Sequence, residues 1–208
     1  MIRLALPKGR NLGTALKAFR AAGVPLEGLE KGDRRLRISL PDEGIEILML
    51  KDWDLPVYVE HGIADCGVVG TDVLTEVGGD LLVPVHFTEG RCRLSLISRG
   101  GPLPEPGSQI RLATKYPRTA HRLLTQRPWG AEVFKLSGSI ELAPLLDLAE
   151  LALDIVQTGR TLRDNHLTEL EVIHQVAPCL VVNRAAYQEH RTELQRLIER
   201  FEAAGVVE

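Results

Sequence analysis

The sequence predicts an α/β protein made of two lobes. Strand-like and helix-like stretches alternate along nearly the whole chain, with neither an internal repeat nor a low-complexity tail. The segment 100–108 (GGPLPEPGS) is dense in Pro and Gly, which predicts a surface connection. The closing strand and helix return to the first lobe in this reading, so lobe I spans 1–90 plus 181–208 and lobe II spans 91–180. A cleft between such lobes is a natural ligand site.

The expected elements follow from two periodicities. Strands are short branched-apolar runs that end at turn signals, and they are expected at 2–6, 36–40, 45–50, 66–69, 81–87, 92–97, 109–114, 132–136, 151–156, 168–175 and 180–182. Helices carry apolar residues at helical spacing and are expected at 12–22, 53–61, 71–77, 118–126 and 141–149. Thr71 and Asp72 are expected to cap the helix at 71–77. One long helix is expected from Arg184 to about Ala204.

Composition is that of an ordinary globular protein, with 208 residues, 44% hydrophobic and 25% charged. The net charge of −3 argues against a nucleic-acid binder with a broad basic surface. No apolar run reaches the roughly 18 residues of a membrane span. The start MIRLALPKGR reads as a strand rather than a signal peptide, so we expect a cytoplasmic location. Cys66, Cys92 and Cys179 are widely spaced and odd in number, which predicts buried thiols rather than disulfides or a zinc site.

The most informative motif is the segment 154–162 (DIVQTGRTL). An apolar strand breaks there into a turn made of Thr158, Gly159, Arg160 and Thr161, and a polar segment able to open a short helix follows. Turn N–H groups, two threonine hydroxyls and a helix N-terminus together suit a single phosphate. Asp154, on the strand just before, is placed to accept hydrogen bonds from ribose hydroxyls. The alternative is an ordinary strand and turn with Asp154 facing water.

Glu141 is a second candidate acid for the ribose. It follows Ser-Gly-Ser at 137–139 and precedes an expected helix, which would bring it beside Asp154 on the next strand. The alternative is a capping-box acid with no ligand. The six histidines show no metal-ligand spacing.

Cations follow two of the expected strands. Lys8 and Arg10 come directly after the first strand, where positive charge suits a polyphosphate, although they are also explained as solvated residues at a helix start. Lys51 opens a charged cluster (KDWDLP at 51–56) and is the better functional candidate there, since Asp52 or Asp54 is explained as a helix N-cap.

A glycine-rich segment at 62–72 (GIADCGVVGTD) surrounds a buried strand. Its glycines at 62, 67 and 70 suit a close approach of the backbone to a ligand, with Thr71 and Asp72 at the following helix start. Close packing of the strand on a helix is the alternative, above all at Gly67.

Together these motifs resemble the short form of ATP phosphoribosyltransferase, the family that commits ATP to histidine biosynthesis. The matching segments cover essentially the whole chain in order and are LPKGR at 6–10, KDWDLPVYVEHGIADCGVVGTDVL at 51–74, ATKYPRTA at 113–120, SGSIELAPLLDLAELALDIVQTGRTLRDNHL at 137–167 and VNRAAY at 182–187. The resemblance implies a fold like that of type II periplasmic binding proteins, with the site in the cleft. It implies that N1 of the ATP adenine displaces pyrophosphate from C1 of phosphoribosyl pyrophosphate, with Mg²⁺ bound through the substrate.

The resemblance also implies the roles of individual residues. The 5-phosphate is held by Thr158, Gly159, Arg160 and Thr161, and the ribose hydroxyls by Asp154 and Glu141. The catalytic cations that face pyrophosphate and ATP phosphates across the cleft are Lys8, Arg10 and Lys51. The residues also expected to face ATP or pyrophosphate are Gly70, Thr71, Asp72 and Arg34, with the adjacent Arg35 as the alternative to Arg34. Where the family usually has arginine this chain has Lys51, which keeps the charge and loses the bidentate fork.

The resemblance finally implies partners. The long form of the family carries a C-terminal regulatory domain that binds histidine, and this chain ends at Glu208, after its last expected helix. A separate histidyl-tRNA-synthetase-like regulatory subunit in a hetero-oligomer is therefore expected, together with self-association, and neither nucleic acid nor membrane is expected as a partner. Two alternatives stay open at this point: another phosphoribosyltransferase, and a non-catalytic two-lobed solute-binding module.

Overall fold

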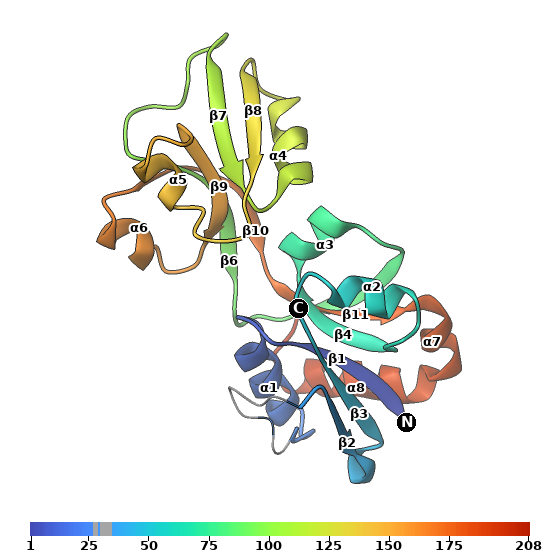
Figure 1. Ribbon diagram of the computed structural model, residues 1–208. Coiled ribbons are helices and arrows are strands. Elements are labelled where there is room, and N and C mark those ends of the chain that lie inside the picture. The colour runs from blue at the N-terminus through green and yellow to red at the C-terminus, as the bar shows by residue number, and fades with distance from the viewer. Residues whose placement is uncertain (27–28, 30–34) are drawn as a thin grey trace. The chain divides into compact units, whose positions relative to one another are not determined.

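The computed structural model describes residues 1–26, 29 and 35–208, which form two compact units (Figure 1). Unit 1 comprises Met1–Arg91 and Ala177–Glu208, and unit 2 comprises Cys92–Val176. The sequence predicts that the chain passes from lobe II back to lobe I between residues 180 and 181, and this boundary falls inside strand β11 (Pro178–Asn183). Because β11 pairs along its length with β4 and β5, the whole strand belongs to unit 1, and the chain crosses just before it.

Unit 1 is built on a six-stranded mixed sheet in the order β2-β3-β1-β4-β11-β5. Its elements besides β11 are β1 (Ile2–Pro7), α1 (Leu12–Ala21), β2 (Arg37–Leu40), the 3-10 turn η1 (Pro41–Glu43), β3 (Ile45–Leu50), α2 (Leu55–Glu60), β4 (Cys66–Gly70), α3 (Thr71–Val77), β5 (Leu81–His86), α7 (Arg184–Glu189) and α8 (Arg191–Ala203). Strand β1 lies between β3 and β4 and runs parallel to both. The carboxyl ends of these three strands therefore meet at one edge of the sheet.

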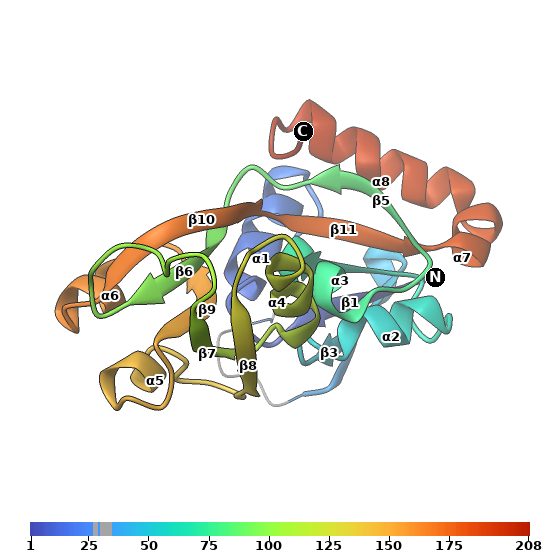
Figure 2. The same cartoon turned by 90° about the horizontal axis from the view of Figure 1, so that it is seen from above.

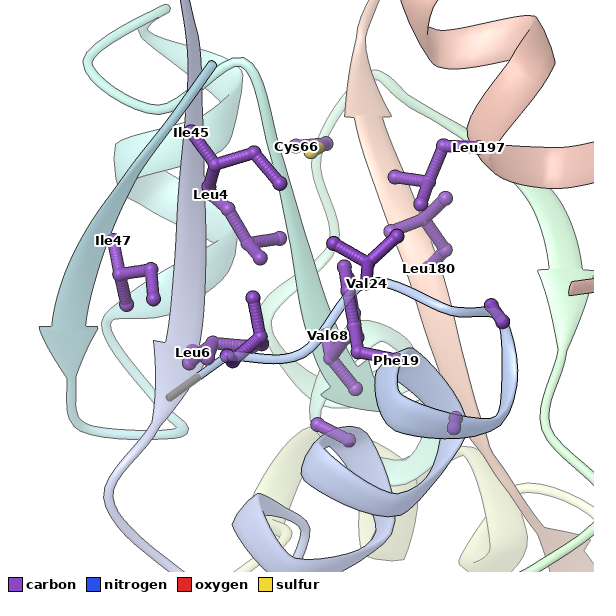
Figure 3. Close-up of a cluster of buried hydrophobic side chains, with 14 of the residues drawn as sticks. Leu4, Leu6, Phe19, Val24, Ile45, Ile47, Cys66, Val68, Leu180 and Leu197 are labelled. Atoms are coloured by element: carbon purple, nitrogen blue, oxygen red, sulfur yellow. The ribbon is translucent and has the colours of Figure 1, made fainter. Parts of the chain in front are cut away.

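Helices α1 and α8 bury one face of this sheet. The ring of Phe201 on α8 meets Phe19 on α1 and Phe87 edge to face, with centroids 4.9 and 5.3 Å apart. Figure 3 shows side chains of this layer, among them Leu4, Val68 and Leu197, gathered between the strands and the helices. Figure 2 shows α8 running alongside β5 and β11. This core sets the position of β1 and of the residues that follow it.

The other face of the unit 1 sheet is covered by α2 and α3. Leu55 and Val59 on α2 and Val73 on α3 join a second buried cluster with Val69 and Val181 of the sheet. Since both faces are covered, β1, β3, β4 and β11 read as nearly continuous apolar runs, as the sequence shows.

Unit 2 is built on a five-stranded mixed sheet in the order β10-β6-β9-β7-β8. Its elements are β6 (Cys92–Ser98), β7 (Gln109–Thr114), α4 (Pro117–Leu124), β8 (Gly130–Lys135), α5 (Leu142–Leu145), β9 (Leu151–Val156), α6 (Arg160–Asp164) and β10 (Thr168–Val176). The central strand β9 runs parallel to β7 and antiparallel to β6. A cluster that includes Ile140, Val156 and Leu162 packs α5 and α6 against this sheet.

Two helices differ from the sequence prediction. The expected long C-terminal helix is divided into α7 and α8 at His190, whose ψ of 33° departs from helical geometry, and Asn183 caps α7 by accepting a hydrogen bond from the Ala186 N–H at 2.9 Å. The helix expected at 141–149 is confined to α5, because Asp147 adopts a positive φ of 57° that a helix cannot contain.

All three cysteines are buried and unbonded to one another, as the sequence predicts. Burial raises the pKa of the Cys66 thiol and raises that of Cys179 to about 12, so neither is a ready nucleophile. None of the described helices combines the length and the hydropathy of a membrane-spanning segment.

Candidate active site

The first group of predicted site residues lies at the carboxyl ends of β1, β3 and β4, and we call Lys8–Arg10, Lys51–Asp52 and Gly70–Asp72 the unit 1 edge. The parallel ladder continues past β1, because the Lys8 N–H donates to the Leu50 carbonyl at 2.8 Å. Pro7 lies opposite Leu50, so Lys8 and Lys51 follow at adjacent positions on neighbouring strands. Both lysines are exposed. The fold thus brings together two cations that are 43 positions apart in the sequence.

Arg10 reaches the start of α3. Its guanidinium lies 3.7 Å from a carboxylate oxygen of Asp72, which is only 4% exposed, whereas the Arg10 side chain is 34% exposed. A buried carboxylate needs a cation or hydrogen bonds to offset its desolvation. Asp72 therefore serves to hold Arg10 in place, while the guanidinium presents its remaining surface to solvent.

Two glycines allow the close approach of these loops. A β-carbon at Gly9 would lie 2.6 Å from an Asp52 carboxylate oxygen, and one at Gly70 would lie 2.1 Å from an Asp72 oxygen. Both distances are far inside van der Waals contact. The unit 1 edge is consequently tightly packed, and any residue larger than glycine at either position must displace a carboxylate.

Gly67 and Thr71 have structural explanations. A β-carbon at Gly67 would meet Leu55 Cδ2 at 2.8 Å and the backbone oxygen of Ala5 at 3.0 Å, which is the close packing of strand and helix that the sequence left open. Thr71 is the first residue of α3 rather than its side-chain cap. Its hydroxyl accepts a hydrogen bond from the Ala177 N–H at 3.2 Å, so it fastens α3 to the strand connection.

Arg34 lies outside the described residues, so its expected role stays a prediction. Asn11, just after Arg10, is 1% exposed, and neither polar atom of its amide has a hydrogen-bond partner among the described residues. Nothing in the segment LPKGRN marks Asn11 as buried, so the sequence does not predict this residue as part of the site.

The second group of site residues lies in unit 2, where the segment Gln157–Thr161, which we call the unit 2 loop, leaves β9. Gly159 has a φ of +68° and precedes α6, a conformation that glycine adopts without strain. The Arg160 N–H donates to Thr158 Oγ1 at 3.3 Å, which folds the turn back on itself. Because α6 has five residues, its dipole is small, and the N–H and hydroxyl groups of the loop are the stronger anion-binding features.

The side chain of Arg160 points into solvent. It is 83% exposed and lies 3.4 Å from Asp164, four residues further along α6. An exposed ion pair of this type adds little to stability. Arg160 is therefore available to a ligand at little cost in folding free energy.

The two candidate acids of unit 2 are both half-buried. Asp154 lies on the central strand β9, opposite Ser95 of β6. Glu141 immediately precedes α5, and its neighbour Ile140 is buried in the same cluster as Val156 and Leu162, which flank the unit 2 loop. One core thus anchors the segment of Glu141 and the loop. The expected pairing of the two carboxylates on one ribose stays a prediction.

Two arginines outside the set of predicted site residues contact the backbone of the unit 2 loop. Arg93 Nη1 donates to the Gln157 carbonyl at 3.3 Å, and Arg163 Nη1 donates to the Thr158 carbonyl at 3.0 Å. Two signals in the sequence mark Arg93: it forms a local basic cluster with Arg91, and it is a charged residue inside the largely apolar strand CRLSLIS. Among the described residues, no group of three His, Cys, Asp or Glu side chains is arranged to hold a metal ion.

Comparison with known proteins identifies the family of this chain. The family model described as ATP phosphoribosyltransferase matches residues 51–203. The chain belongs to the ATP phosphoribosyltransferase family. The ATP phosphoribosyltransferase of Thermus thermophilus is 46% identical over 200 residues, which cover 96% of this chain and 95% of that protein. That of Deinococcus radiodurans is also 46% identical, over 96% of this chain and 89% of that protein.

Solved structures show the same relationship. The ATP phosphoribosyltransferase (HisG:HisZ) complex of Thermotoga maritima contains a chain with a TM-score of 0.82 and 32% identity, covering 98% of each chain. An alkanesulfonate-binding protein of Xanthomonas axonopodis pv. citri has a TM-score of 0.60 at 13% identity, covering 98% of this chain and 72% of that one, which shows the fold alone. The two-lobed α/β fold predicted from the sequence is thus confirmed.

The activity follows from the family. The protein is a pentosyltransferase of the short form that acts on ATP in the first step of histidine biosynthesis. Of the two alternatives left open by the sequence, another phosphoribosyltransferase is excluded by the family match, and a solute-binding module shares only the fold.

Proposed function

We propose that the unit 2 loop holds the 5-phosphate of phosphoribosyl pyrophosphate and that the unit 1 edge binds the phosphates of ATP and of the departing pyrophosphate. The observation that carries the first assignment is the loop geometry: a left-handed Gly159 between two threonines, with loop carbonyls held by arginines. The second assignment rests on three cations that follow two neighbouring strands: Lys8 and Arg10 after β1, and Lys51 after β3, with Arg10 reaching Asp72 at the start of α3.

The ribose is proposed to lie on unit 2, between the unit 2 loop and the two acids. Asp154 and Glu141 accept hydrogen bonds from the ribose 2- and 3-hydroxyls, since each is a half-buried carboxylate beside the loop or its core. Such bonds fix the sugar while the bond at C1 breaks. Positioning of this kind supplies a large share of the barrier reduction when a bimolecular displacement becomes effectively unimolecular.

The reaction needs stabilisation of the leaving group more than a strong base. Adenine N1 carries a lone pair and attacks C1 directly, while the C1–O bond to pyrophosphate breaks and its electrons leave with pyrophosphate. Preorganised cations at the departing oxygens stabilise this charge. Lys8, Arg10 and Lys51 are the proposed cations. Mg²⁺ is proposed to arrive bound to substrate phosphates, its usual mode with such ligands.

A regulatory partner is part of the proposal. Thermotoga maritima has a related chain in a complex described as HisG:HisZ, and the present chain covers 98% of that chain. We therefore expect this chain to assemble with a histidyl-tRNA-synthetase-like subunit in a cytoplasmic hetero-oligomer, in which copies of this chain also associate.

The assignment is tested with the purified chain, ATP, phosphoribosyl pyrophosphate and Mg²⁺, with and without the candidate regulatory subunit. We expect N1-phosphoribosyl-ATP to accumulate, and its absorbance is used to measure the amount formed. The residue assignments are tested separately by calorimetry of phosphoribosyl pyrophosphate with Asp154→Asn. Affinity equal to that of the unmodified chain would remove Asp154 from the ribose site, and absence of product under every condition would refute the substrate pair.

A further inference from the structure

We propose that Arg93 and Arg163 are positioning residues that set the orientation of the unit 2 loop before phosphoribosyl pyrophosphate binds. This inference rests on the proposed function of that loop. Both guanidiniums touch backbone carbonyls of the loop, at Gln157 and Thr158, and they come from different elements, β6 and α6.

The consequence of these contacts follows from peptide geometry. No peptide bond of the described chain is cis, and in a trans peptide the C=O of one residue and the N–H of the next point in opposite directions. With the Gln157 carbonyl directed at Arg93, the Thr158 N–H points away from Arg93. With the Thr158 carbonyl directed at Arg163, the Gly159 N–H points away from Arg163. The two arginines thus direct two loop N–H groups away from themselves, and the 5-phosphate is proposed to bind on the side to which these N–H groups point.

Arg93 is itself held rigidly. Its Nε and Nη2 donate to the two carboxylate oxygens of Glu169 at 2.5 and 2.6 Å. Glu169 also accepts a hydrogen bond from the hydroxyl of Ser95 at 2.7 Å, and Ser95 is fully buried on β6. Arg93 lies opposite Val156, the last residue of β9, so its side chain begins directly beside the loop.

The pairing with Glu169 decides how Arg93 acts. The hydrogen bond from Arg93 lowers the pKa of Glu169, so this carboxylate is ionised at neutral pH and offsets the charge of the guanidinium. Arg93 therefore acts on the phosphate through the shape of the loop rather than as a counter-ion. That role needs a planar fork with N–H groups in several directions, which lysine does not have.

A second arginine–glutamate pair in unit 2 offers a matched control. Arg127 is bonded to Glu171 on β10, and the two side chains are 26% and 31% exposed, close to the 30% and 23% of Arg93 and Glu169. Arg127 stacks on Trp129 at 5.4 Å and has no contact with the loop among the described residues. Loss of Arg127 thus reports what a purely structural ion pair contributes.

The experiment compares Arg93→Gln, Arg93→Lys and Arg127→Gln in the full chain, together with its regulatory subunit if activity requires it. We expect both Arg93 variants to raise the dissociation constant and KM for phosphoribosyl pyrophosphate by about tenfold, as for one or two lost hydrogen bonds to a charged ligand, with KM for ATP unchanged. Arg127→Gln is expected to lower thermal stability about as much as Arg93→Gln does, while KM for phosphoribosyl pyrophosphate and KM for ATP both stay unchanged. Arg163→Gln is expected to act like Arg93→Gln.

Three results would overturn the inference. Normal affinity in Arg93→Gln would show that the loop holds its shape without Arg93. Recovery of affinity in Arg93→Lys would show that charge, not geometry, is what matters. Equal loss in Arg127→Gln would show a general effect of destabilising unit 2. Failure of the unmodified chain to bind phosphoribosyl pyrophosphate would instead refute the proposed function.

A milder variant covers the case in which Arg93→Gln does not fold. Ser95→Ala removes one hydrogen bond from Glu169 and leaves the ion pair in place. We expect it to weaken phosphoribosyl pyrophosphate binding by roughly threefold, as for a single indirect hydrogen bond. Unchanged affinity in a folded Ser95→Ala protein would count against the inference.

Discussion

The unit 1 edge and the unit 2 loop present cations and N–H groups to phosphates by different means. At the unit 1 edge, glycines at positions 9 and 70 let buried or crowded carboxylates pack against the backbone, and Arg10 is placed by the buried Asp72. The unit 2 loop is mostly exposed and is shaped by a left-handed glycine and by guanidiniums behind it. Packing places charges firmly but tolerates no added volume, whereas a tethered loop tolerates volume and depends on its hydrogen bonds.

The largest expected effect concerns Lys51. Lys51→Met removes one proposed cation from the departing pyrophosphate, and loss of one such electrostatic group costs about 10²-fold in rate. A single-turnover measurement tests this, with Lys51→Arg as the variant expected to keep the rate. Lys17→Met is the matched control, since Lys17 is an exposed unit 1 lysine paired with Glu89 at 3.1 Å. A normal rate in Lys51→Met would remove Lys51 from the reaction.

Thr161→Ala probes the loop without changing its backbone. Losing a hydrogen bond to a charged phosphate is expected to weaken phosphoribosyl pyrophosphate binding by about 1.5–3 kcal/mol. Calorimetry measures this, and thermal unfolding is expected to be unchanged, because the Thr161 side chain is exposed. Unchanged affinity would place the 5-phosphate elsewhere.

Gly67→Ala tests whether close packing, rather than contact with a ligand, requires a glycine at this position of unit 1. The added methyl group meets Leu55 and the Ala5 backbone, and overpacking of this kind costs roughly 1–3 kcal/mol of unfolding free energy. Urea denaturation measures the loss. Affinity for phosphoribosyl pyrophosphate at low temperature is expected to stay unchanged, since Gly67 acts through packing. A stable variant with impaired binding would instead support the ligand role that the sequence left open.

Two substitutions of Gly159 distinguish the effect of backbone conformation from the effect of side-chain volume in the unit 2 loop. Its φ of +68° costs an alanine about 1–2 kcal/mol, whereas asparagine adopts this region more readily. Gly159→Ala is therefore expected to weaken phosphoribosyl pyrophosphate binding more than Gly159→Asn. Equal effects of the two variants, measured by calorimetry, would indicate that side-chain volume rather than loop conformation is limiting.

The smallest expected effect is a pH dependence of stability. Arg93 holds the pKa of Glu169 below its ordinary value of 4.5. A carboxyl with a lower pKa in the folded state stabilises that state above its unfolded pKa, and this stabilisation is lost as the pH falls through the folded pKa. The urea midpoint of the unmodified chain should therefore exceed that of Glu169→Gln near neutral pH. The difference between the two midpoints should shrink as the pH falls below the ordinary pKa of a glutamate, 4.5.

Glu150→Gln is the control for this measurement. The pKa of the Glu150 carboxyl is also lowered, by its hydrogen bond with Arg111, and both side chains are exposed. We therefore expect the stability of Glu150→Gln to depend on pH in the same direction, without any change in affinity for phosphoribosyl pyrophosphate. A Glu169→Gln gap that widens in acid would contradict the assigned ion pair.

Much of this protein was readable from the sequence alone. Apolar runs and turn residues predicted nearly every strand, and the order of motifs predicted the family and its reaction. Local chemistry explains this success, since a strand such as β9 and a turn such as Thr158-Gly159 carry their conformational preferences in a few adjacent residues. The prediction of a helix over 141–149 was wrong in its extent, because one residue, Asp147, adopts a positive φ that ends the helical conformation.

Only the tertiary structure decided which distant residues meet. It placed Lys8 beside Lys51, turned Asp72 toward Arg10, explained Gly67 by packing on Leu55, and set Arg93 behind the unit 2 loop. These contacts depend on strand order and register, which arise from the packing of whole sheets and leave no mark within a short window of sequence. The sequence by itself determined the chemical groups and the family, and the register of two sheets determined which of those groups act together.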